Sequence, residues 1–179
     1  MVHNPRKGPG GLVCGLVDLD VDDDWPGAVR AQIEADVRRV AERLRTLSEA
    51  QLAAEAPPYP SRVAGGRAVA QVLAEAAQAI EERASGAQPQ WRAVPVGSDF
   101  AVGDQVAVTG HDLLAALPPS AAPAGDHAVP VDKSPSPAGD HAVPAVGPEE
   151  TVWAGGTRRT AREVVDDAAA QLAALRRLL

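Results

Sequence analysis

The sequence of 179 residues holds one cysteine, Cys14, and few aromatic residues: one Phe, one Tyr and three Trp. A single cysteine excludes an internal disulfide. Because aromatic side chains bury the most apolar area each, their scarcity predicts a thin core of Ala, Val and Leu in closely packed helices. The sequence also lacks a run of about 18 apolar residues, the length that crosses a bilayer, and its first residues do not resemble a secretory signal. We therefore expect a cytoplasmic protein with no membrane partner.

Lysine is nearly absent and occurs only at Lys7 and Lys133. The formal net charge is -7, which argues against nucleic acid as a partner, because such proteins need a basic face to neutralise phosphates. The preference for Arg over Lys, with abundant Ala, Gly, Pro and Val, indicates a bacterial protein from a GC-rich genome.

Apolar side chains recur every three or four residues from Pro26 to Leu47, which predicts an amphipathic helix. The stripe consists of Val29, Ile33, Val37, Val40, Leu44 and Leu47. Ser48 and Gln51 have capping-box spacing and predict a short second helix. The same periodicity predicts a helix through Val69–Ile80 that stops near Ser85-Gly86, and another from Gly103 to Leu117. Gly110 lies on the inner face of that last helix, which indicates either close helix approach or room for something bound.

Between these two helices, residues 87–101 are predicted to be an irregular segment that lays Trp91 and Phe100 on the bundle. Residues 118–150 hold half of the sixteen prolines and repeat the octapeptide PAGDHAVP at 123–130 and 137–144. Proline at this density blocks helix and sheet hydrogen bonding, so we expect a flexible, disordered linker.

A second capping box, at Thr160 and Glu163, opens a C-terminal helix. Its apolar stripe needs a partner surface, either the bundle or another protein, and is the predicted interaction face: Val165, Ala168, Leu172, Leu175 and Leu179. The predicted fold is mainly α, a three- or four-helix bundle with a Pro-rich disordered linker before the last helix. It comprises a flexible acidic N-terminal segment (1–24), the bundle domain (25–117), the linker (118–150) and a C-terminal amphipathic helix (151–179).

Candidate chemistry concentrates on one pair, His111 and Asp112, which the predicted helix 103–117 would hold in place. The other histidines, His3, His127 and His141, fall in segments expected to be flexible, which cannot hold a metal at fixed geometry unaided. Neither a phosphate-binding glycine pattern nor a local signature of Ser/His/Asp or Cys/His catalysis occurs. We predict no catalytic residues, no cofactor and no metal site, with His111 and Asp112 as the alternative metal candidates.

Three stretches, at 44–58 (LRTLSEAQLAAEAPP), 70–77 (AQVLAEAA) and 106–117 (VAVTGHDLLAAL), resemble the DinB-like, mycothiol-dependent maleylpyruvate isomerase superfamily. The resemblance implies a four-helix bundle, which in that family holds a divalent metal through three histidines. This sequence has Gln71 and Thr109 where ligands of the family would fall. The resemblance therefore implies a bundle that has lost its metal site and has a binding or regulatory role.

These observations favour a non-catalytic helical protein that acts through apolar helix faces, with a protein partner or self-association. Two alternatives remain: a diverged metal- or thiol-dependent enzyme centred on His111 and Asp112, and a structural homo-oligomer whose helices share one core.

Overall fold

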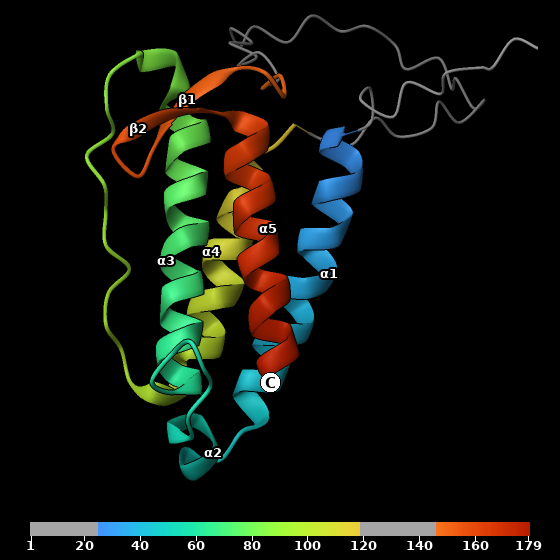
Figure 1. The fold of residues 1–179 in the computed structure, drawn as a ribbon, viewed down its shortest axis with the longest axis vertical. Coiled ribbons are helices and arrows are strands. Elements are labelled where there is room, and N and C mark those ends of the chain that lie inside the picture. Colours follow the sequence, from blue (N-terminus) through green and yellow to red (C-terminus); the bar gives the residue numbers. More distant parts are fainter. Residues whose placement is uncertain (1–24, 119–145) are drawn as a thin grey trace, which may run out of the picture.

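The computed structural model describes residues 25–118 and 146–179, and it confirms a mainly helical bundle (Figure 1). Predictions for residues 1–24 and for the greater part of the Pro-rich segment, 119–145, lie outside the described residues. The helices are α1 (Trp25–Thr46), α2 (Glu49–Ala53), α3 (Arg62–Glu81), α4 (Val102–Ala116) and α5 (Ala161–Leu178), with short 3-10 turns η1 (Glu82–Ser85) and η2 (Asp99–Ala101). None of the described helices is long and apolar enough to cross a membrane.

The four long helices form a closed ring in which α4 and α5 each contact both α1 and α3. Gly66 at the start of α3 meets Val102 at the start of α4, so these two helices run parallel. At the other side of the bundle, Arg62 donates a hydrogen bond to the carbonyl of Leu178, so α5 runs antiparallel to α3. Two parallel neighbours need a connection that travels back along the bundle. Residues 87–98, called the strap below, make that return beside α3 (Figure 1).

The core contains Val, Leu, Ile and Ala from all four long helices, as the composition predicts. The stripe of α5 belongs to this core: Val165, Ala168, Leu172 and Leu175 are fully buried, and Leu179 packs against them half-buried. Because α5 contacts α1 and α3 of the same chain, these side chains would meet another protein only if α5 left the bundle.

Gly110 permits the close approach of α4 to α1. A Cβ at this position would lie 2.4 Å from Cγ2 of Val37, well inside van der Waals contact. Of the two explanations for a glycine on this inner face, the structure shows close helix approach.

A buried ion pair joins α1 to α5 across the bundle. Asp36 is only 1% exposed and accepts hydrogen bonds from Arg176 at 2.5 Å and from Gln32 at 2.6 Å. Because the carboxylate has both a cation and an amide donor, its charge is compensated inside the bundle.

Residues 151–160 belong to the segment 151–179 that the sequence assigns to the C-terminal helix, and they precede the capping box at Thr160 that is predicted to open it. They form an antiparallel hairpin of β1 (Thr151–Ala154) and β2 (Thr157–Thr160), and the helix begins only at Ala161. The turn residues Gly155 and Gly156 have φ of 56° and 80°, which suits the tight turns of two-residue hairpins. Apolar periodicity misses these strands because β2 reads Thr-Arg-Arg-Thr and has no apolar face.

The two aromatic residues of the segment 87–101 differ in burial. Trp91 is half-buried and packs against the core as predicted. Phe100 is 59% exposed, so the expectation that it covers the bundle was wrong.

Candidate functional site

Glutamine side chains hold the strap to the bundle. Gln78 of α3 makes two hydrogen bonds with the backbone of Arg92: its Oε1 accepts from the N–H at 3.0 Å and its Nε2 donates to the carbonyl at 3.4 Å. Two turns earlier, Gln71 accepts from the N–H of Val94 at 2.8 Å. From the neighbouring helix, Gln105 donates to the carbonyl of Pro95 at 2.5 Å.

The backbone of the strap is hydrogen-bonded on one side in the way that a strand of a sheet would be. In an extended chain, the N–H and C=O of alternate residues point to the same side. Arg92 and Val94 point toward α3, where Gln78 and Gln71 supply the bonds that a neighbouring strand would supply. Pro95 points its carbonyl the other way, toward Gln105 of α4.

A cleft of about 650 Å³ lies between the strap, α3 and α4, and we call it the strap cleft. Its size falls in the range of ligand sites, roughly 300–1,000 Å³. Small and apolar side chains make up much of its lining: Ala74, Ala77, Ala93, Val94, Pro95 and Val108. Two buried polar side chains of the lining are engaged, because Gln78 holds the strap and the Thr109 hydroxyl donates to the carbonyl of Gln105 at 2.9 Å. The Oε1 atom of Gln105 is buried and has no hydrogen-bond partner among the described residues.

The charges around the strap cleft are mainly negative. Glu81, Asp104 and Asp112 contribute carboxylates, and Arg92 is the cation in the lining. Asp104 is neutralised by Arg45, at 2.7 Å. Within residues 25–118 and 146–179, the structure shows no ion pair for Glu81 or Asp112, and both are exposed. The cleft thus offers, beside apolar walls, two carboxylates and the Arg92 guanidinium, none of which has an ion pair among the described residues.

Exposed apolar side chains gather on the same face. Among the described residues, the large apolar side chains that are mostly exposed are Val96 at 82%, Phe100 at 59% and Val108 at 58%. Val108 lines the strap cleft, and Phe100 directly precedes Ala101, which also lines it. Val96 borders a smaller hollow that shares Val94, Pro95 and Gln105 with the cleft. The face therefore extends beyond the cleft itself.

The structure does not bring His111 and Asp112 together as a site. Both are exposed on α4, and Asp112 lines the strap cleft while His111 is not part of its lining. Neighbours on a helix diverge, so adjacency in sequence does not make a shared ligand pair. Cys14 lies outside the described residues.

Gln71 and Thr109, which the resemblance to the DinB-like superfamily would place at metal-ligand positions, make hydrogen bonds within the chain instead. Gln71 accepts a hydrogen bond from the strap and donates one to Glu75, at 2.9 Å. The Thr109 hydroxyl donates to the carbonyl of Gln105 in its own helix. In the part of the chain that the structure describes, no group of three or more His, Cys, Asp or Glu is arranged to hold a metal ion.

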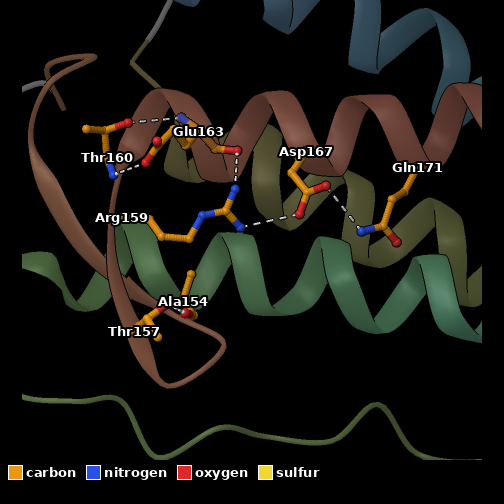
Figure 2. Close-up of polar contacts among 7 residues, drawn as sticks. All are labelled: Ala154, Thr157, Arg159, Thr160, Glu163, Asp167 and Gln171. Atoms are coloured by element: carbon orange, nitrogen blue, oxygen red, sulfur yellow. Dashed lines mark hydrogen bonds and ion pairs between the residues drawn. The ribbon is translucent and has the colours of Figure 1, made fainter.

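A second polar cluster lies where the hairpin meets α5 (Figure 2). The capping box forms as the sequence predicts: the Thr160 hydroxyl accepts from the Glu163 N–H at 3.2 Å, and Glu163 Oε2 accepts from the Thr160 N–H at 2.9 Å. Arg159 links the hairpin to the helix through Asp167, at 3.4 Å, and through the Glu163 carbonyl, at 3.1 Å. These bonds join neighbouring elements of one chain, which indicates a structural role.

The capping bonds have a consequence for acid stability. The Thr160 N–H, and then the Thr160 hydroxyl, lower the pKa of Glu163 below its ordinary value of 4.5. The carboxylate therefore stabilises the fold above about pH 4.5, and this contribution is lost as the pH falls through the lowered pKa. Glu163→Gln keeps a capping side chain that cannot titrate. We expect its thermal midpoint to fall less than that of the wild type when the pH is lowered from about 6 to about 3.

The exposed variant Glu149→Gln is the matched control for this measurement, because it removes the same charge from a residue outside the cap. Parallel acid profiles of the wild type and Glu163→Gln would contradict the role given to the cap.

Comparison of the chain with protein-family models, curated proteins and solved structures finds no match.

Proposed function

We propose that this chain is a non-catalytic binding protein that acts through contacts with a partner protein, and that the strap cleft is its contact surface. The observation that carries the proposal is that Val108, one of the three mostly exposed large apolar side chains of the described residues, lines the strap cleft, while Val96 lines the adjoining hollow. Exposed apolar groups rimmed by charge are typical of protein interaction sites.

The charges support a partner segment that carries Lys or Arg. Glu81 and Asp112 stand unpaired by the described residues at the cleft, whereas Asp104 already has Arg45. A partner's cations would be attracted to Glu81 and Asp112, and small apolar side chains would fit against the alanines of α3. The expected occupant is a basic segment with small apolar residues.

The same charges disfavour self-association through this face. In a two-fold dimer the same patch faces itself, so Glu81 and Asp112 of two copies would approach one another, with Arg92 as the one cation of each lining to offset them. Juxtaposed like charges oppose such a contact. A different protein is therefore the better occupant.

The resemblance to the DinB-like superfamily supports a non-catalytic role as well. Gln71, at one lost ligand position, is used to hold the strap that borders the cleft. A position that binds a metal in that superfamily would here help to shape a binding surface.

A phage-displayed library of random dodecapeptides, selected on the full chain, tests the proposal. Selected peptides should be rich in Lys or Arg, and the double variant Glu81→Lys with Asp112→Lys should weaken their binding about tenfold, because each attraction becomes a repulsion. The control variant Glu42→Lys makes the same change on an exposed position of α1 outside the cleft. Equal weakening by both variants, or peptides without cations, would overturn the proposal.

A further inference from the structure

We infer that the partner segment binds in extended form and pairs with the strap as an added β-strand. The inference rests on the proposed function and names how the strap cleft holds its partner. It follows from which backbone groups of the strap are occupied and which are available.

One edge of the strap is bonded to α3. The N–H and carbonyl of Arg92 and the N–H of Val94 are bonded to the side chains of Gln78 and Gln71. This edge faces α3, and glutamine amides fill the place of a neighbouring strand. A strand fixed along one edge has its backbone aligned for pairing along the other.

The opposite edge faces the strap cleft. Because the direction of backbone groups alternates, the N–H and C=O of Ala93 point away from α3, on the side where the Pro95 carbonyl meets Gln105 of α4. Ala93 is exposed and lines the cleft. Its backbone groups make no hydrogen bond with any described residue.

The edge available for pairing is short. Pro95 has no N–H, and its carbonyl is already taken by Gln105. Pairing therefore centres on Ala93 and extends toward Trp91, whose backbone groups lie on the same edge. Main-chain bonds of this kind give affinity, while pockets for alternate side chains give specificity. The cleft's alanines and the carboxylates of Glu81 and Asp112 would provide that specificity.

An N-methyl scan of the tightest-binding library peptide tests strand pairing without altering the protein. Methylation removes one backbone N–H at a time. Strand addition predicts that binding weakens about fivefold to tenfold at positions whose N–H meets the strap and little at those between, so losses alternate with a period of two. The Ala93 N–H should also exchange with solvent at least tenfold more slowly when the peptide is bound, as measured by NMR.

Two variants of the protein provide a matched comparison. Ala93→Pro removes the N–H on the available edge, whereas Gln90→Pro places a proline at an exposed strap position outside the cleft lining. Ala93→Pro should weaken peptide binding about fivefold or more, and Gln90→Pro less than twofold.

The outcomes separate this inference from the proposed function. Peptides that depend on Glu81 and Asp112 but show no alternation and no protection of Ala93 would overturn strand pairing and leave the strap cleft as the binding surface. Peptides that ignore the charge reversal would overturn both.

Discussion

A chain that lacks residues 151–179 is expected to lose cooperative folding. The stripe of α5 is buried against α1 and α3, and its removal would expose the facing side chains of both helices. Burial of Val165, Leu172 and Leu175 alone contributes roughly 5–9 kcal/mol, at about 1.5–3 kcal/mol for each fully buried side chain. That amount is comparable to the whole stability of a typical domain, about 5–15 kcal/mol. A thermal melt followed by circular dichroism should show a broad, non-cooperative transition.

Point variants in the full chain separate the loss of packing from the loss of length. Leu172→Ala should lower the free energy of unfolding by about 2–5 kcal/mol, whereas Arg177→Ala, on the exposed side of the same helix, should change it by less than about 0.5 kcal/mol. A truncated chain that still melts sharply would show that α5 is not part of the core.

Gly110→Ala is expected to destabilise the protein, opposite to the effect of this substitution in most helices. Alanine normally stabilises a helix interior by about 1 kcal/mol relative to glycine. Here a Cβ would lie 2.4 Å from Cγ2 of Val37 and 2.7 Å from its Cγ1. Overpacking typically costs about 1–3 kcal/mol, and α4 must move from α1 to relieve the contact. After the gain in helix propensity is subtracted, we expect a net loss of up to about 2 kcal/mol in urea unfolding.

The double variant Val37→Ala with Gly110→Ala identifies the cause. Removing the two methyl groups of Val37 makes room for the new Cβ, so the double variant should be more stable than the sum of the single effects predicts, by about 0.5–3 kcal/mol. Additive effects, or a Gly110→Ala variant more stable than the wild type, would contradict the close contact between α1 and α4.

Helices with strong apolar periodicity were predictable from the sequence. The stripe from Val29 to Leu47 corresponds to α1, and the capping boxes at Ser48 and Thr160 mark the starts of α2 and α5. Both signals are local, because a helix forms its hydrogen bonds within a few residues and shows its buried face every three or four residues.

The hairpin and the course of the strap were not predictable, because neither depends on local periodicity. The glycines at 155 and 156 were a hairpin signal, yet the strands beside them are only four residues long. The strap is held by glutamines far away in sequence: Gln78 and Arg92 are 14 residues apart, and Gln71 and Val94 are 23 apart. The spacing of Gln71 and Gln78 by two helical turns places both on one face of α3, but nothing local identifies what they hold.

The candidate site could be predicted only in part. The sequence singles out His111 and Asp112 on α4. Asp112 lines the strap cleft, but His111 does not. The stripe of α5, selected as an interaction face, packs into the core of its own chain. Amphipathic helices reveal that a face is buried, and only the tertiary structure reveals against what. Exposure of apolar side chains is equally hard to predict, because it depends on neighbours distant in sequence, as at Val96, Phe100 and Val108.

The most direct test of the account is NMR chemical-shift mapping of the full chain with the tightest-binding library peptide. Amide shifts should concentrate on the strap around Ala93, on the second half of α3 and on α4 near Val108. The exposed faces of α1 and α5 should stay unchanged. Shifts centred on α1 or α5, or no peptide that the reversal of Glu81 and Asp112 weakens, would contradict the assignment of the strap cleft as the binding surface.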